Sequence, residues 1–205
     1  MTPSMDPFRR FEWGVPAKSY CSYAFILHML KCLDEQNGRM AVVVPQGVLY
    51  RVGSEQVIRQ RIIEANFLDA VIALPPRLYG ENTPSLCLMV FKKNRSNTDI
   101  LFIDASSERF YEKGKKQNLL RSNDVISIFK NRDTEDGVSI KASAQDIAGH
   151  DYALRVSKYI DTDDEDTEMD ISAISKELSA IEANLVVAHS RVVEYLDELG
   201  LRDEK

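Results

Sequence analysis

Three short apolar runs, each ended by turn-forming residues, constrain the fold of this 205-residue chain more than any other feature. They cover residues 39–45, 68–74 and 86–92. The first run is rich in valine, which is typical of a strand buried on both faces by helices. Residues 75–85 are too few for a crossover helix, so we expect the second and third strands to pair antiparallel. The pattern predicts an α/β fold.

Further elements follow from apolar periodicity and from capping residues. They are a helix over residues 22–36 with a left-handed stop at Asn37-Gly38, a helix from a cap at Gly53 or Ser54 to about residue 66, a strand over 99–104 and a helix over about 122–130. Residues 139–159 give only a weak mixed pattern. One main domain is therefore expected over residues 1–160.

The net charge of −6 is unevenly distributed along the chain. Residues 161–170 contain seven acidic residues and no basic ones, so the rest of the chain is close to neutral. Bulk charge thus neither favours nor excludes a nucleic-acid partner, which would need a local basic patch. We expect a solvated acidic linker here. It is not an EF-hand loop, because its sixth position lacks Gly and its twelfth, Ser172, is not Glu.

Membrane and secretion patterns are absent from the sequence. No window approaches the roughly 18 consecutive apolar residues of a membrane span, and the first residues do not have the order of a signal peptide. Cys21, Cys32 and Cys87 are widely spaced in apolar surroundings, so we expect buried thiols in a reducing compartment. The predicted location is the cytoplasm.

The C-terminal segment has apolar residues at alternating spacings of three and four, a heptad seam that begins after Asp170. The seam consists of Ile171, Ile174, Leu178, Ile181, Leu185, Ala188, Val192, Tyr195 and Leu199. Such a seam needs a partner surface. Residues 171–200 are therefore predicted to form a helix that packs either on its own domain or, as a coiled coil or bundle, on another chain.

Several ordered blocks give the chain a family resemblance. They are residues 23–30, 38–51 and 74–79, followed by 102–106 and 151–152. Together they resemble the modification (methyltransferase) subunit of type I restriction-modification systems. The resemblance implies the closing half of a class I S-adenosylmethionine-dependent methyltransferase sheet, which is Rossmann-like and has an antiparallel last strand. It also implies a coiled-coil tail.

Members of that family transfer a methyl group from S-adenosylmethionine to adenine N6 in DNA. The acidic-aromatic-glycine cofactor loop and the Asn/Asp-Pro-Pro-Phe/Tyr catalytic motif of the family do not occur among these residues. We therefore expect no catalytic and no cofactor-binding residue here, no tightly bound cofactor and no activity of the chain alone, as for a truncated fragment. No metal-binding set is expected either.

The resemblance implies DNA and the subunits of a type I complex, the specificity subunit above all, as partners. Tyr79 stands where the family places an aromatic residue that stacks the flipped base, although a rim or core tyrosine is the alternative. Arg51, at a strand end, is a candidate DNA contact or a surface salt bridge. Arg9 and Arg10 are candidate DNA contacts in a basic-aromatic segment whose aromatics could instead fill a core.

Two further expectations concern the lysines of one loop and the function of the whole chain. Lys113, Lys115 and Lys116 lie in a polar loop and are expected to be solvated. The alternative function for the whole chain is a non-enzymatic assembly module, which would bind the specificity subunit through the C-terminal helix.

Overall fold

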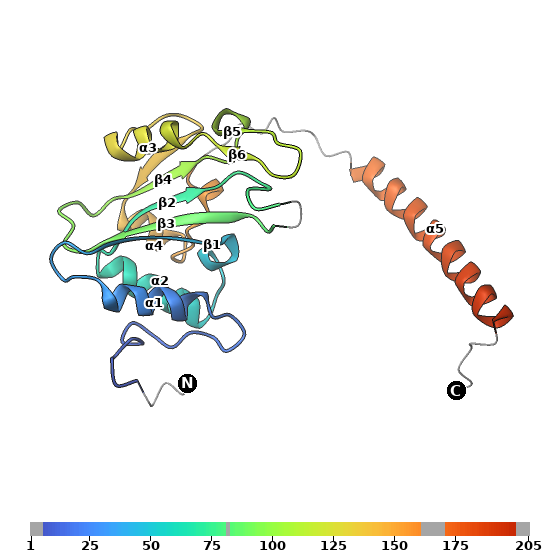
Figure 1. Ribbon diagram of the computed structural model, residues 1–205, viewed down its shortest axis with the longest axis horizontal. Helices are drawn as coiled ribbons and strands as arrows, with labels where there is room; N and C mark the ends of the chain where they lie inside the picture. The colour runs from blue at the N-terminus through green and yellow to red at the C-terminus, as the bar shows by residue number, and fades with distance from the viewer. Residues whose placement is uncertain (1–5, 81–82, 161–170, 200–205) are drawn as a thin grey trace. The chain divides into compact units, whose positions relative to one another are not determined.

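The structure is a computed structural model that describes residues 6–80, 83–160 and 171–199 (Figure 1). The chain divides into two compact units, Met1–Thr162 and Asp163–Lys205, and each is treated by itself. No helix among the described residues is long and apolar enough to cross a membrane.

The first unit alternates helices and strands. The helices are α1 (Ser22–Cys32), α2 (Ser54–Glu64), α3 (Ser122–Asn131) and α4 (Ala144–Gly149), with the 3-10 turns η2 (Gln46–Leu49), η3 (Glu108–Phe110) and η4 (Val156–Lys158). The strands are β1 (Arg39–Pro45), β2 (Leu68–Ala73), β3 (Leu86–Lys92), β4 (Ile100–Asp104), β5 (Tyr111–Glu112), β6 (Leu119–Leu120) and β7 (Ser139–Ala142).

Five strands form one mixed sheet in the order β1-β3-β2-β4-β7, and β5 and β6 form a separate two-stranded sheet. β3 pairs antiparallel with both β1 and β2, whereas β2 and β4 are parallel. The predicted antiparallel pairing of the second and third strands is confirmed. Because β1, β2 and β4 run in the same direction, their carboxyl ends meet at one edge of the sheet.

The expectation that β1 is buried on both faces is wrong. Among the described strands, β1 pairs with β3 alone and so forms an edge of the sheet. Val44 is 6% exposed, whereas its neighbour Val43 is 41% exposed. An apolar run predicts that a strand packs against a core, but it does not show whether one face or both faces of the strand are covered.

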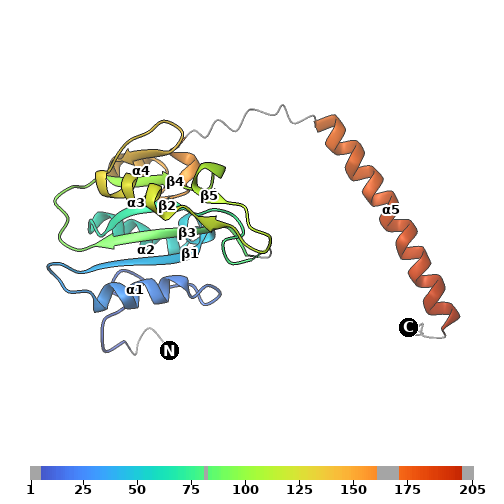
Figure 2. The same cartoon turned by 45° about the horizontal axis from the view of Figure 1, so that its top comes forward.

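Helices cover the two faces of the sheet separately (Figures 1 and 2). One core joins α1, α2, α4 and η4 to the lower face in Figure 1, and a second core joins α3 and η3 to the upper face. In the first core the rings of Phe102 and Tyr159 stack with their centroids 4.1 Å apart. Burial of these apolar side chains supplies most of the folding free energy at about 25 cal/mol per Å².

A buried ion-pair cluster fixes the start of β2. Asp69 lies 3.1 Å from Arg95 and 2.9 Å from Arg132, and Arg132 also contacts Asp99 at 2.8 Å. Burial lowers the pKa of Arg95, while the Asp69 carboxylate opposes this effect. Because one carboxylate serves two guanidinium groups, this cluster ties β2 to α3 and to the loop before β4.

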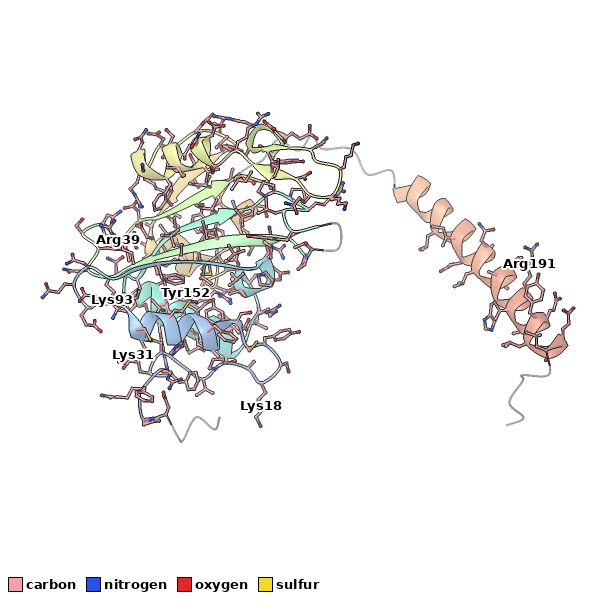
Figure 3. The ribbon with its side chains drawn as sticks, in the orientation of Figure 1. Lys18, Lys31, Arg39, Lys93, Tyr152 and Arg191 are labelled. Carbon is pink, nitrogen blue, oxygen red and sulfur yellow. The ribbon has the colours of Figure 1, made fainter. Side chains whose placement is uncertain are left out.

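At the same end of the sheet, Lys93 follows β3 and its ammonium group donates to Glu35 at 2.7 Å (Figure 3). This pair ties the end of β3 to the turn after α1. The turn comes earlier than expected, because α1 ends at Cys32, where Leu33 has an extended backbone. The Asp34 carboxylate then accepts the N–H groups of Gln36 and Asn37. A side chain that competes for backbone donors ends a helix more effectively than periodicity extends it.

The cysteine expectation holds only for Cys87, which is buried, because Cys21 and Cys32 are exposed. Cys87 lies on β3, and burial raises the pKa of its thiol to about 12. The two exposed cysteines flank α1 rather than facing its core.

In the second unit, α5 (Ile171–Glu198) confirms a long C-terminal helix. Six large side chains of the predicted seam are each more than half exposed: Leu178, Ile181, Leu185, Val192, Tyr195 and Leu199. The side chains of Ile171 and Ile174 lie outside the described residues, and so does the predicted acidic linker over 161–170.

Candidate functional site

Arg51 follows the carboxyl end of β1 and packs within the chain. Its guanidinium carbon lies 3.8 Å from the ring centroid of Tyr20, and its Nη1 atom lies 3.6 Å from a carboxylate oxygen of Glu55. Its Nη2 atom covers Gly47 so closely that a Cβ there would stand 2.6 Å away. Arg51 therefore holds η2 against the start of α2, and its role as a DNA contact stays a prediction.

A buried polar layer lies beneath Arg51. Arg59, 2% exposed, donates to the carbonyls of Tyr152 and Val48 at 2.9 and 3.1 Å, and the Tyr23 hydroxyl donates to the same Val48 carbonyl. These bonds join α1, η2, α2 and the segment after α4. Satisfied buried polar groups of this kind fix a single packing arrangement.

Glu55 is the unusual member of this layer. It is 1% exposed, and neither carboxylate oxygen has a hydrogen-bond partner among the described residues. Burial raises the pKa of Glu55, and the nearby Arg51 and Arg59 charges offset only part of that effect. The carboxylate thus depends on its ion pair with Arg51 and on the charge of Arg59.

Tyr79 lies in the loop that follows β2, at the edge where the carboxyl ends of β1, β2 and β4 meet. Its side chain is 65% exposed, which excludes the alternative of a core tyrosine. Arg77 and Gly80, on either side of it, have positive φ angles of 56° and 116°. The loop is therefore sharply turned, and it presents the Tyr79 ring to solvent.

Asn118 holds this loop in place, a role that sequence reasoning missed. It is 4% exposed, its backbone N–H donates to the Arg77 carbonyl at 3.0 Å, and its Nδ2 donates to the Pro76 carbonyl at 2.8 Å. The two segments are separated by about forty residues of sequence, so no local pattern could have indicated the contact.

Two alternative roles were considered for the N-terminal segment: contact with DNA, or filling of a core by its aromatic side chains. Phe11 and Trp13 pack against the first core, and Trp13 meets the Phe67 ring edge-on at 5.6 Å. Arg10 lies over the exposed Phe8 ring, 4.8 Å from its centroid, and Arg9 has a φ of 51°. Phe11 and Trp13 thus pack on a core as the alternative stated, whereas Phe8 does not, and DNA contact by Arg9 and Arg10 stays a prediction.

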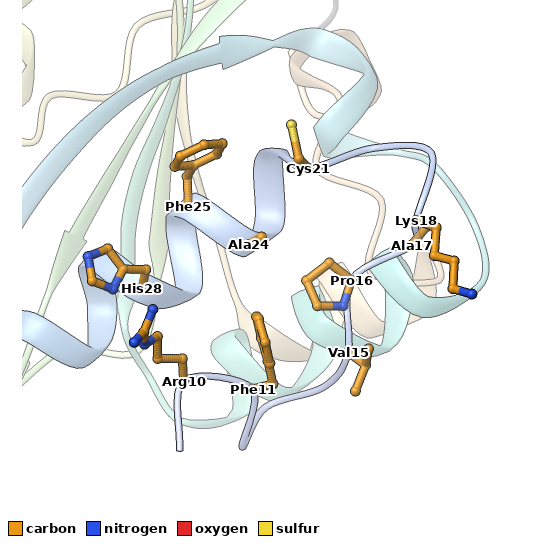
Figure 4. Close-up of a pocket in the computed structure, with 10 residues that line it drawn as sticks. All are labelled: Arg10, Phe11, Val15, Pro16, Ala17, Lys18, Cys21, Ala24, Phe25 and His28. Carbon is orange, nitrogen blue, oxygen red and sulfur yellow. The ribbon is translucent and has the colours of Figure 1, made fainter. Parts of the chain in front are cut away.

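A hollow of about 580 Å³ lies between this segment and α1 (Figure 4). Phe11, Phe25, His28 and Lys18 are among the side chains around it. They come from residues 10–28 alone, so this hollow brings together none of the strand-end residues Arg51 and Tyr79.

The fit to the family's cofactor can be tested at the end of β1. A glycine at such a strand end lets a ligand approach the backbone closely. Here the space above Gly47 is filled by the Arg51 guanidinium. These residues do not form a cofactor cradle. No group of three or more His, Cys, Asp or Glu side chains within the described part of the chain could hold a metal ion.

A mixed sheet with β3 inserted antiparallel between β1 and β2, helices on both faces and an aromatic loop at the carboxyl edge define an α/β protein of the methyltransferase type. The sequence model of the N-6 DNA methylase family matches residues 3–168. The chain therefore belongs to this family.

Relatives that match this chain include methylase subunits of type I restriction enzymes. The MpnII methylase subunit of Mycoplasma pneumoniae is 35% identical over 80% of this chain and 30% of its own length. The MjaVIII methylase subunit of Methanocaldococcus jannaschii is 27% identical over 93% of this chain and 34% of its own length. This chain thus spans about a third of the relatives it matches.

A solved structure agrees with the fold. The type I restriction-modification methyltransferase subunit from Streptococcus thermophilus is 36% identical over 77% of this chain and 34% of that one, with a TM-score of 0.71. The resemblance to type I methyltransferase subunits that the sequence blocks implied is confirmed.

Proposed function

We propose that this chain is the C-terminal portion of a type I restriction-modification DNA methyltransferase subunit. Residues 1–160 would close the class I sheet of its catalytic domain, and residues 171–200 would form a partner helix after an acidic linker. The observation that carries the proposal is the family match over residues 3–168 of a chain that spans about a third of its relatives.

The reaction proposed for the complete subunit is methyl transfer from S-adenosylmethionine to adenine N6 in DNA. An adenine must leave the duplex before its amino group can react, and the flipped base is held by stacking on aromatic side chains. Tyr79 suits this role because its ring is exposed at the carboxyl edge, where α/β sheets bind ligands. DNA as substrate would place the subunit in the cytoplasm.

The cofactor and catalytic groups are proposed to come from a segment outside this chain. The filled space above Gly47 supports this division. Incubation of the purified chain with radiolabelled S-adenosylmethionine and DNA should then give no labelled adenine. Co-expression with a segment that carries the cofactor loop and the Asn-Pro-Pro-aromatic motif should restore labelling. Micromolar affinity of the chain alone for S-adenosylmethionine in calorimetry would contradict the division.

The alternative is an assembly module that binds the specificity subunit without catalysis. The exposed seam of α5 favours such a contact, because seam positions such as Leu185 remain 67% exposed. Both functions share this partner surface, so the labelling experiment separates them.

The partner surface itself can be tested on α5. Removal of residues 171–205 should abolish co-purification with a specificity subunit. Leu185→Asp, on the seam, should weaken it strongly, because a charge would be buried in a helix interface. Val187→Asp is the control, since Val187 is also exposed on α5 but lies off the seam. Equal effects of the two substitutions would show that the seam is not the docking element.

A further inference from the structure

The turn between β5 and β6 carries a local excess of positive charge. Lys113, Lys115 and Lys116 are all exposed there. Lys113 forms an ion pair with Glu108, whereas no ion pair within the described residues involves Lys115 or Lys116. Two adjacent lysines without a carboxylate partner in the described part of the chain contribute little to its folding, so their positive charge is available to an anionic ligand.

The turn between β5 and β6 is closed by strand pairing and by a close approach of its backbone. Gly114 approaches the Gln117 carbonyl so closely that a Cβ would stand 2.1 Å from the oxygen. Tyr111 and Glu112 pair with Leu120 and Leu119 on the other side of the turn. The lysines are therefore carried on a closed hairpin, which fixes where their backbone lies.

Asn118 joins this hairpin to the Tyr79 loop. Its side-chain Nδ2 donates to the Pro76 carbonyl and its backbone N–H donates to the Arg77 carbonyl, and the residue is only 4% exposed. Lys116 is two residues from Asn118, and Tyr79 is two residues from Arg77. Since a residue spans at most about 3.6 Å, the backbones of Lys116 and Tyr79 each lie within about 7 Å of this contact. Figure 1 shows β5 and β6 near the end of β2.

An exposed aromatic ring beside unpaired lysines is the combination that binds a nucleic-acid strand, since bases stack on the ring and phosphates meet the charges. We propose that Lys115 and Lys116 contact the phosphates of the DNA strand whose base faces Tyr79, and that Asn118 is the positioning residue that sets the two elements together. This proposal rests on the proposed function and adds the backbone contact to it.

The test measures how DNA binding by the full chain depends on salt. Fluorescence anisotropy of a labelled duplex that contains one mismatched adenine is followed between 50 and 200 mM KCl. Each phosphate contact contributes a slope of about −0.9 to log K against log salt. Lys115→Ala/Lys116→Ala should therefore flatten the slope by about 2, which removes about tenfold of the affinity loss over this range.

Lys130→Ala/Lys141→Ala is the matched control. It removes the same charge from two exposed lysines on α3 and β7. The control should keep the wild-type slope. The proposal is overturned if the control flattens the slope equally, if the Lys115 and Lys116 variant keeps it, or if the wild-type chain shows no salt-dependent binding.

Asn118→Ala tests the positioning role separately. It keeps both lysines, so the salt slope should stay near that of the wild type, while quenching of 2-aminopurine at the mismatched position by Tyr79 should decrease. Unchanged quenching would assign Asn118 a folding role alone. Failure of these binding tests alongside successful adenine labelling by the reassembled subunit would overturn this inference and leave the proposed function standing.

Discussion

At the scale of single residues, Asp69 is the carboxylate that pairs with two guanidinium groups. Its carboxylate lies against both Arg95 and Arg132, and the Arg95 side chain is 1% exposed. Asp69→Ala should lower the free energy of unfolding by about 3–5 kcal/mol, because it leaves a buried guanidinium without its partner. Urea denaturation followed by circular dichroism would measure the change.

Glu135→Ala is the control for that substitution. Glu135 pairs with Arg109 where both side chains are about half exposed and solvent screens the charges, so its loss should cost much less than the loss of Asp69. Equal losses for the two variants would show that burial does not distinguish these pairs.

At the scale of elements, β1 offers a matched pair of adjacent valines. Val44 faces the first core at 6% exposure, and Val43 faces the other side of the sheet at 41%. Val44→Ala should cost about 2 kcal/mol of unfolding free energy through lost burial and a residual cavity. Val43→Ala should stay within about 0.5 kcal/mol. A reversal of this order in chemical denaturation would mean that the strand is shifted in register by one residue.

The same elements show what sequence reasoning could provide. Strong periodicity predicted α1, α2 and α3, and the short link between β2 and β3 predicted that these strands pair antiparallel. β7 and α4 were missed because each is a short element, and short elements carry too few residues to show a period. The family resemblance pointed to Tyr79 in the loop after β2, but Asn118, which holds that loop through Pro76 and Arg77, is distant in sequence. Only the folded chain shows which loops meet.

At the scale of the whole molecule, acid should weaken the fold in a defined window. Burial is the largest single influence on Asp99 and would raise its pKa, but the hydrogen bond and charge of Arg132, together with further hydrogen bonds to the carboxylate, hold that pKa below the ordinary value of 3.8. A lowered pKa in the folded state contributes stability above the unfolded pKa, and this contribution is lost as pH falls. Stability should therefore decline from about pH 4 downward.

Asp99→Asn separates this contribution from the rest of the acid response. The variant should be less stable than the wild type at pH 7, and the difference should shrink as pH falls below the ordinary carboxyl pKa and through the lowered pKa of Asp99, where the wild type also loses the charge. Urea midpoints at pH 7, 4 and 3 would measure the difference. A gap that stays constant with pH would rule out the Asp99 charge as its cause.

The exposed edge of β1 affects how the purified chain can associate with other copies of itself. The bonds of Gly38 with Lys93 and of Gln46 with Ser85 place the backbone groups of Arg39, Ala41 and Val43 on the outer side. Unpaired strand edges recruit strands from other copies, and charged residues and proline limit that growth. Arg39 and Pro45 bracket the edge in this way. Only about three residues of the edge remain open between them, so pairing with strands of other copies should be confined to this short stretch.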